Sequence, residues 1–281
     1  MSDLAPRTFR LVIEYAGGAF EGWQVQTGDR PARTVQGELA TAVESITGAP
    51  GQIRGAGRTD AGVHAHAQVA SLVLAADFEP GKLARALTAR LPNDMAVLRC
   101  DVVPEGWDAL REARGKLYRH QIWNGASRSP LREDRFAWVR EPLDLERMRA
   151  AAKVFLGEHD FASMCAAGSD VKTTVRTVLG FDVRGVSRGE FILDVEGEGF
   201  LRHMVRNLAG TLIEIGRGRW EVAEAGAILE SRDRGRAGPT APAQGLALVR
   251  VMDSFSDPDR FPSGESRGLQ PASIDGESPV G

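Results

Sequence analysis

The sequence contains little cysteine and no long apolar segment. Two of its 281 residues are cysteine, Cys100 and Cys165, and their spacing fits neither a disulfide framework nor a zinc motif. No apolar run approaches the roughly 18 residues of a membrane helix, and residues 1–10 lack the apolar core of a signal peptide. We therefore expect a soluble cytoplasmic protein without structural disulfides.

The sequence also lacks an excess of positive charge, because 35 basic and 38 acidic residues give a formal net charge of -3. Six acidic and two basic residues lie within 253–281, so residues 1–252 carry 32 acidic and 33 basic side chains. Phosphate binding depends on local basic clusters rather than on total charge. Two candidate clusters are Arg111, Arg114, Lys116 and Arg119, and Arg202, Arg206, Arg217 and Arg219. The total charge therefore does not exclude a nucleic-acid partner.

The apolar periodicity predicts an α/β (α+β) protein with two similar mixed-sheet halves, flanking helices and a central cleft. The halves are expected at residues 1–106 and 107–252, followed by a disordered acidic tail at 253–281. Strands are predicted at 8–15, after the 54–66 loop as far as Leu74, at 95–103, 116–123 and 246–251, and as a hairpin at 177–197. Helices are predicted after Thr34, before Pro92, and at 144–156, 201–215 and 220–230. A cleft between halves is a favoured ligand site.

Residues 54–66 carry the most specific local pattern, Arg-Gly-Ala-Gly-Arg-Thr-Asp-Ala-Gly-Val-His-Ala-His. The glycines allow tight turns and close ligand approach, so the loop leaves the carboxylate of Asp60 accessible before a strand. Ordinary turn chemistry is the alternative interpretation. A nucleotide phosphate loop is disfavoured because no Gly-Lys-Ser/Thr follows and a strand comes next. His64 and His66 alone make an incomplete metal site, so no metal is expected.

The residues 57–65, Gly-Arg-Thr-Asp-Ala-Gly-Val-His-Ala, resemble the signature of the tRNA pseudouridine synthase A family. Further segments resemble that family in the same order along about residues 8 to 252. They are Tyr-Ala-Gly-Gly at 15–18, Gly-Trp-Gln-Val-Gln at 22–26, Thr-Val-Gln-Gly at 34–37, Lys-Leu-Tyr-Arg at 116–119, Gly-Glu-His-Asp-Phe at 157–161, Phe-Leu-Arg-His-Met-Val-Arg-Asn at 200–207 and Thr-Ala-Pro-Ala-Gln-Gly-Leu at 240–246. Two positions depart from the pattern: His120 stands where a second tyrosine is frequent, and Thr174 where proline is frequent.

The resemblance implies three catalytic residues, Asp60, Tyr118 and Arg206. The family's aspartate is catalytic, its arginine pairs with that aspartate, and its tyrosine stacks on the uracil while the hydroxyl takes or relays the C5 proton. Ordinary structural roles are the alternatives, a solvated arginine face for Arg206 and a half-buried strand tyrosine for Tyr118. Because uracil is detached from N1 and rejoined through C5 without a redox change, no cofactor is needed.

Substrate-binding roles are also expected for Arg58 and Arg202 from their positions near Asp60 and Arg206 in the sequence, and for Leu246 from the resemblance. A target base stacked in the anticodon stem would have to flip outward to react. Arg58 would then fill the position that the base leaves or hold a phosphate, and the alternative for Arg58 is a salt bridge to Asp60. Arg202 would share a helix face with Arg206, and its alternative is a solvated position. Leu246 would pack against the flipped ring, and a core leucine is nearly as plausible.

The implied substrate is the anticodon stem-loop of tRNA, modified at positions 38 to 40 by a homodimer. Tolerance of neighbouring positions points to recognition of RNA shape rather than of base sequence. A catalytically silent RNA-binding module of the same fold is the alternative function, although binding alone would not need the trio of Asp60, Tyr118 and Arg206.

Overall fold

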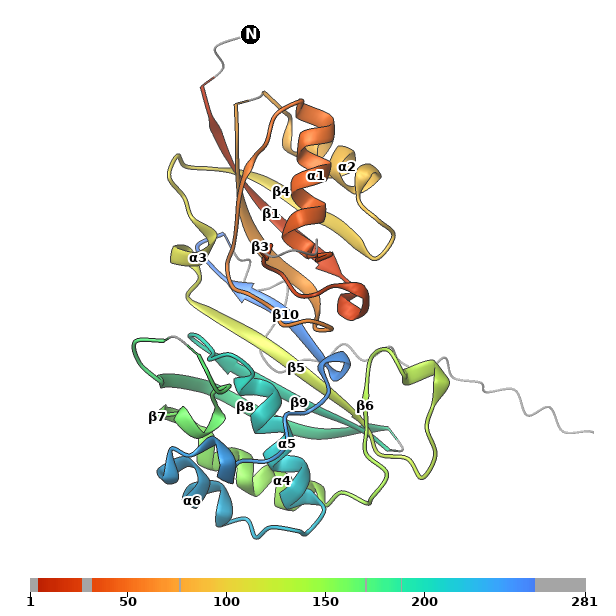
Figure 1. The fold of residues 1–281 in the computed structure, drawn as a ribbon, viewed down its shortest axis with the longest axis vertical. Helices are drawn as coiled ribbons and strands as arrows, with labels where there is room; N and C mark the ends of the chain where they lie inside the picture. Colours follow the sequence, from red (N-terminus) through yellow and green to blue (C-terminus); the bar gives the residue numbers. More distant parts are fainter. Residues whose placement is uncertain (1–4, 27–31, 76, 170, 188, 256–281) are drawn as a thin grey trace, which may run out of the picture.

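One continuous mixed sheet runs through the protein (Figure 1). The computed structural model describes residues 5–26, 32–75, 77–169, 171–187 and 189–255. The strands are β1 (Arg7–Tyr15), β2 (Gln52–Gly55), β3 (His64–Leu74), β4 (Met95–Val103), β5 (Gly115–Trp123), β6 (Ala137–Trp138), β7 (Gly157–Asp160), β8 (Val175–Ser187), β9 (Glu190–Gly197) and β10 (Leu246–Met252). Their order is β4-β1-β3-β10-β5-β9-β8-β7, with β2 beside β3 and β6 beside β5.

The last strand joins the two parts of the sheet. Strand β10 pairs in parallel with β3, where Ala247 lies opposite His64, and antiparallel with β5, where Leu248 lies opposite Tyr118. The segment that closes the chain thus lies between the Asp60 loop and the tyrosine strand. Strand pairing across the whole width confirms the mixed-sheet α+β class, and the two sets of strands form one sheet.

Helices flank the sheet in two groups. They are α1 (Val35–Thr47), α2 (Pro80–Arg90), α3 (Ala109–Glu112), α4 (Leu145–Ala152), α5 (Met204–Gly216) and α6 (Glu224–Ser231). Figure 1 shows α1 and α2 beside β1 and β4, α4 and α5 beside β8 and β9, and α6 farther from the sheet, with its strand contacts at β7. None of the helices in the described ranges is long and apolar enough to cross a bilayer.

The first helix follows the expected local signals. The Thr34 hydroxyl accepts from the Gly37 amide at 3.2 Å and satisfies one of the unpaired N–H groups at the start of α1. Leu39 and Val43 are completely buried, so the apolar stripe of α1 packs onto the core as its spacing predicts. The helix end is set by Gly48 in the left-handed conformation.

Helix α5 begins three residues later than its apolar spacing predicts. His203 adopts φ 63° and ψ 1°, outside the right-handed helical region, and the helix starts at Met204. Arg202 therefore precedes the helix, and the expectation that Arg202 and Arg206 share one helix face is wrong. The apolar pattern could not reveal this boundary because Leu201 is buried before the helix starts.

The expected tail also begins too early. The carboxylate of Asp253 is buried and pairs with Arg10 Nε at 2.9 Å, and the Phe255 ring packs edge to face on Trp107 with ring centroids 6.0 Å apart. Residues 253–255 therefore belong to the folded protein, because a buried ion pair and an aromatic contact hold them. The rest of the expected tail, 256–281, lies outside the described residues, as does Arg188 in the predicted hairpin turn.

Candidate active site

Asp60 lies in the loop between β2 and β3, and backbone hydrogen bonds tie that loop to the segment after β1. The amide of Trp23 donates to the Thr59 carbonyl at 3.0 Å, and the amide of Gly62 donates to the Phe20 carbonyl at 3.2 Å. Gly22 makes the close approach feasible, because it has φ +99° and a Cβ there would lie 2.8 Å from the Thr59 carbonyl oxygen. The glycine-rich Asp60 loop is thus anchored on both sides of its carboxylate.

Two buried polar side chains also hold this loop, and the sequence analysis did not identify them. The hydroxyls of Tyr15 and Thr59 are 2.8 Å apart, and Gln68 Nε2 donates to the Gly57 carbonyl at 3.0 Å. Burial raises the pKa of Tyr15 to about 12, so its hydroxyl stays protonated. The available signal was a polar Gln68 inside an otherwise apolar strand pattern, since such a buried amide needs partners.

Two side chains lie close to the Asp60 carboxylate. Arg206 Nη1 lies 3.4 Å and His203 Nε2 lies 3.6 Å from the same oxygen, Oδ2. The other oxygen, Oδ1, has no hydrogen-bond partner within the described ranges, and the Asp60 side chain is 28% exposed. One carboxylate oxygen therefore lies near two nitrogen groups, while the other makes no hydrogen bond within the described residues.

Arg206 is held in place by the segment before β10. Its Nε donates to the Ala241 carbonyl at 2.8 Å, and the Ala241 amide donates back to the Arg206 carbonyl at 3.0 Å. The neighbouring Asn207 accepts at Oδ1 from Thr240 at 2.7 Å and from Arg234 at 3.0 Å. The Thr-Ala-Pro segment thus orients the guanidinium toward Asp60, as the predicted pairing of Arg206 with the aspartate requires.

Tyr118 lies on β5 near the same carboxylate. Its side chain is 8% exposed and packs edge to face on Phe200, with ring centroids 5.2 Å apart. Burial raises the pKa of Tyr118, and the nearby Tyr15 and Asp60 raise it further. The ring is therefore fixed by packing while its hydroxyl remains a neutral donor beside Asp60.

The first predicted basic cluster is divided between the two faces of the sheet. Lys116 shares the face of Tyr118, two positions away on β5, and its Cε would lie 2.9 Å from a Cβ at Gly57. Burial lowers the pKa of Lys116. Arg119 points to the opposite face and binds Asp194 through Nε at 2.7 Å and Nη2 at 2.9 Å. Strand alternation, which a count of basic residues ignores, separates the two.

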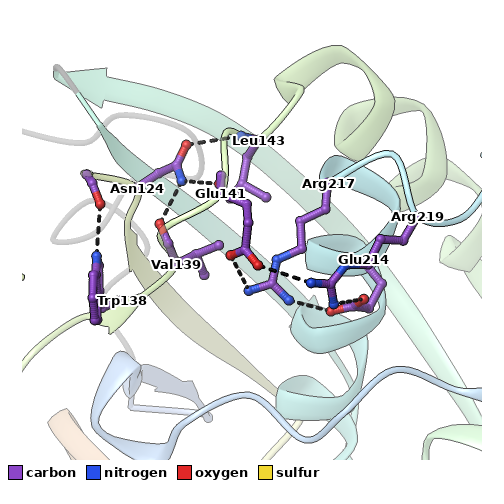
Figure 2. A network of polar contacts seen from close by, with 9 residues as sticks. Asn124, Trp138, Val139, Glu141, Leu143, Glu214, Arg217 and Arg219 are labelled. Carbon is purple, nitrogen blue, oxygen red and sulfur yellow. Dashed lines mark hydrogen bonds and ion pairs between the residues drawn. The ribbon is translucent and has the colours of Figure 1, made fainter. Parts of the chain in front are cut away.

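The second predicted basic cluster is also divided. Figure 2 shows that Arg217 and Arg219, at the far end of α5, bind the carboxylates of Glu214 and Glu141. Arg217 follows Arg206 by eleven positions along α5 and its end, which corresponds to about 16 Å along the axis. Arg217 and Arg219 therefore neutralise acidic neighbours at that end, away from Asp60, and tie α5 to the segment before α4.

The predicted substrate-binding residues take different positions. Arg58 is exposed two residues before Asp60, and no salt bridge joins the two within the described residues. Arg202 is exposed next to His203. Leu246 is 5% exposed and lies opposite His120 in the β10–β5 pairing, two residues from the partner of Tyr118. Arg58 and Arg202 are thus both exposed, whereas Leu246 is largely core.

The two histidines considered as metal ligands serve other contacts. His64 Nδ1 accepts from the Gly17 amide at 3.0 Å, and its Nε2 lies 3.1 Å from the Gln244 carbonyl oxygen. His66 lies 3.7 Å from Glu14. Both line a cavity of about 510 Å³ together with Gln121, on the face of β5 opposite to Tyr118. Within the described ranges no group of three or more His, Cys, Asp or Glu side chains could hold a metal.

The two departures from the family pattern have structural roles. His120 is fully buried, its Nε2 lies 3.2 Å from the Pro242 carbonyl oxygen, and burial lowers its pKa to about 4. Thr174 donates its hydroxyl hydrogen to Asp160. Neither touches Asp60, so both affect local packing.

Comparisons with known proteins find similar sequences over most of the chain. A family model described as tRNA pseudouridine synthase matches residues 11–109 and 151–252. The tRNA pseudouridine synthase A of Myxococcus xanthus is 42% identical over 255 residues, covering 91% of this chain and 95% of the relative. The tRNA pseudouridine synthase A of Pelobacter propionicus is 43% identical over 247 residues, covering 87% of this chain and 99% of the relative.

Among solved structures, a Cbf5-Nop10-Gar1 complex aligns over 84% of this chain and 59% of the matched chain, with 13% identity and a TM-score of 0.35. That similarity is too weak to carry an argument. The sequence relatives and the family match cover both the Asp60 loop and the Arg206 helix. By these matches, the chain belongs to the tRNA pseudouridine synthase family.

Proposed function

We propose that this enzyme converts uridines at positions 38 to 40 of the tRNA anticodon stem-loop into pseudouridine, with Asp60 as the reacting carboxylate. Family membership assigns the general reaction, the formation of pseudouridine in tRNA. The observation that carries the role of Asp60 is the arrangement of its two oxygens, since Arg206 lies 3.4 Å from Oδ2 while Oδ1 has no hydrogen-bond partner within the described residues.

The reaction needs a carboxylate but no redox partner. The N1–C1′ bond of uridine breaks, uracil turns, and a C5–C1′ bond forms, while the proton at C5 leaves and N1 gains one. Atoms and charge balance without an external oxidant, reductant or energy source, so we propose no cofactor. Asp60 attacks C1′, attacks the uracil ring or removes a ribose proton, and each route uses the carboxylate as a nucleophile or a base.

Tyr118 is proposed to support the detached uracil. Its ring is held against Phe200 and offers a flat apolar surface, and its hydroxyl is close enough to Asp60 to feel its charge. Because burial raises the pKa of Tyr118, the hydroxyl would relay the C5 proton rather than act as a preformed phenolate.

Access to the target base requires that it leave the stem. A base stacked between its neighbours in an RNA helix cannot be reached by a protein side chain, so the uridine must flip outward. Arg58 is exposed beside Asp60 and suits the vacated stack or a phosphate, and the exposed Arg202 suits a second phosphate. Leu246 would contact the ring at the edge of the core. The buried position of Leu246 also fits a purely structural role.

We further propose a cytoplasmic homodimer in which one tRNA contacts both subunits, and a division of the chain into parts 1–106 and 107–252. The first part carries Asp60, and the second carries Tyr118 and Arg206. A division of this kind would place the reaction where the two parts meet on either side of β10.

The proposal is tested by tritium release from unmodified tRNA containing C5-labelled uridine. The native protein should release tritium, and Asp60→Asn should release none while binding tRNA with unchanged affinity. Sequencing of the product for pseudouridine then assigns positions 38 to 40. Binding by the native protein without any release would instead support the non-catalytic RNA-binding module.

A further inference from the structure

His203 adopts a backbone conformation that its side chain disfavours. It is one of two non-glycine residues with positive φ within the described ranges, the other being Arg232 with φ 53°. A residue with a Cβ rarely occupies this left-handed region, and such residues persist where the surrounding structure imposes the conformation, frequently at functional sites. The position of His203 directly before α5 therefore needs an explanation.

The conformation directs the ring toward Asp60. Leu201, two residues earlier, is buried in the core, and the His203 carbonyl already accepts the first helical hydrogen bond from the Asn207 amide at 2.9 Å. No side-chain capping bond forms at this position. Instead, Nε2 of the ring lies 3.6 Å from Oδ2 of Asp60, and the side chain is 27% exposed. The strained turn thus serves the contact with Asp60 rather than the helix start.

The charges around the ring keep it neutral. Burial lowers the pKa of His203, and the cations Arg206, Arg202 and Arg234 lower it as well, whereas Asp60 raises it. The net direction is downward, so the imidazole is uncharged at neutral pH. A neutral ring with its proton on Nε2 is a hydrogen-bond donor to Oδ2.

We propose that His203 is a positioning residue that holds Oδ2 of Asp60 together with Arg206 and thereby leaves Oδ1 as the oxygen that acts on the nucleoside. The inference rests on the proposed role of Asp60. The present separation of 3.6 Å exceeds a hydrogen bond, and contacts of this kind tighten when substrate fills the site.

Arg206 and His203 contribute differently to holding the Asp60 carboxylate. Arg206 places a positive charge 3.4 Å from Oδ2, and its own position is fixed by the Ala241 carbonyl. A second cation would hold the negative charge more tightly and reduce the reactivity of the carboxylate. A neutral imidazole restricts rotation of the carboxylate without adding charge, which is what a reacting oxygen requires from a support.

The test uses His203→Gly, because glycine accepts the left-handed conformation without strain while removing the ring. We expect this variant to fold at least as stably as the native protein, to keep its KM for tRNA, and to lose about 10²-fold in kcat, the size typical of a misplaced catalytic group. Free imidazole should restore part of kcat. His203→Gln, whose amide retains a donor, should lose less.

The matched control is Arg232→Gly, which relieves the second left-handed position away from Asp60 and should leave kcat unchanged. Native kcat in His203→Gly would overturn the proposal, because the position would then serve the backbone alone. A rise in KM with native kcat would overturn it too, because the ring would then bind RNA rather than position Asp60.

A readout that needs no turnover separates this inference from the proposed function. NMR titration of the five histidines should show a lower pKa for His203 in Asp60→Asn than in the native protein, because the negative neighbour is lost. An unchanged His203 pKa would overturn the contact even in an active enzyme. A native protein that makes no pseudouridine would overturn the proposed function, and the reacting role of Oδ1 with it, whatever the titration shows.

Discussion

Arg206 Nη1 lies 3.4 Å from Asp60 Oδ2, although 146 positions separate the two residues in the chain. The contact joins the loop before β3 to the helix α5. It depends on the Ala241 carbonyl, which accepts from the same guanidinium at 2.8 Å. Charge and geometry at Asp60 are therefore set by segments from three distant parts of the chain.

Arg206→Lys tests whether geometry matters in addition to charge. Lysine keeps the positive charge but lacks the planar fork that contacts Asp60 and Ala241 together. We expect kcat to fall about 10²-fold with little change in KM, because the carboxylate is no longer held in one orientation. Steady-state tritium release measures both constants. Native kcat in this variant would mean that a point charge is enough.

Tyr118→Phe and Tyr118→Leu separate the ring from the hydroxyl. If the ring supports the uracil and the hydroxyl relays the C5 proton, Tyr118→Phe should slow proton release while tRNA binding and glycosidic cleavage persist. Tyr118→Leu should impair both steps, because the flat surface is lost. Single-turnover assays that follow cleavage and tritium release separately provide the measurement. Equal losses in both variants would assign the whole effect to the hydroxyl.

Tyr15→Phe probes the support of the Asp60 loop. The substitution removes the hydroxyl partner of Thr59 and should cost about 1 kcal/mol of stability. The loop would also gain freedom, so kcat should fall more than KM changes. Denaturant unfolding combined with Thr59→Val in a double-mutant cycle measures the coupling. Strictly additive effects would show that the hydroxyl pair contributes nothing of its own.

Glu214→Gln should weaken stability with little effect on catalysis. The buried Glu214 carboxylate binds Arg217 at 2.6 Å and Arg219 at 2.9 Å (Figure 2). Because Arg219 is half exposed, we expect a loss of about 1–3 kcal/mol. Glu146→Gln, in the exposed pair with Arg149, is the control and should change stability by less than about 0.5 kcal/mol. Urea unfolding distinguishes them, and equal losses would refute the role of burial.

Stability should fall on mild acidification. Burial lowers the pKa of His64 and of His120 to about 4, against about 6.5 in the unfolded chain. Between these values the unfolded state binds protons that the folded state does not, so each histidine should cost about 1.4 kcal/mol per pH unit as the pH falls. His120→Gln should flatten the dependence measured by urea unfolding between pH 7 and 5. An unaltered slope would exclude His120 as a cause.

Local sequence signals predicted helices and strands well where a capping residue or an apolar pattern was clear. Thr34 caps α1 as expected, and the expected strand at 95–103 is present as β4. The short strand β2 was not expected, because its four residues are too few to show a periodic apolar pattern and its pairing with β3 stabilises it. A four-residue strand depends on its neighbour for its structure, which no local pattern contains.

The sequence predicted only part of the candidate site. Asp60, Tyr118 and Arg206 were named from motifs, and the structure places all three together, while their catalytic roles remain predictions. His203, Gln68 and Tyr15 were missed. Their contacts with the Asp60 loop arise from strand register and from a left-handed turn before α5. A sequence motif reveals neither the register nor the backbone conformation.

The amino-acid order by itself determined the glycine-rich Asp60 loop, the helix caps and the family, because these depend on residues adjacent in the chain or on an unbroken string. The tertiary structure alone decided which basic residues face Asp60. Strand alternation sent Arg119 to the opposite face, and the length of α5 carried Arg217 away to bind Glu214. Side-chain direction depends on register and packing, and both are set only when distant segments meet.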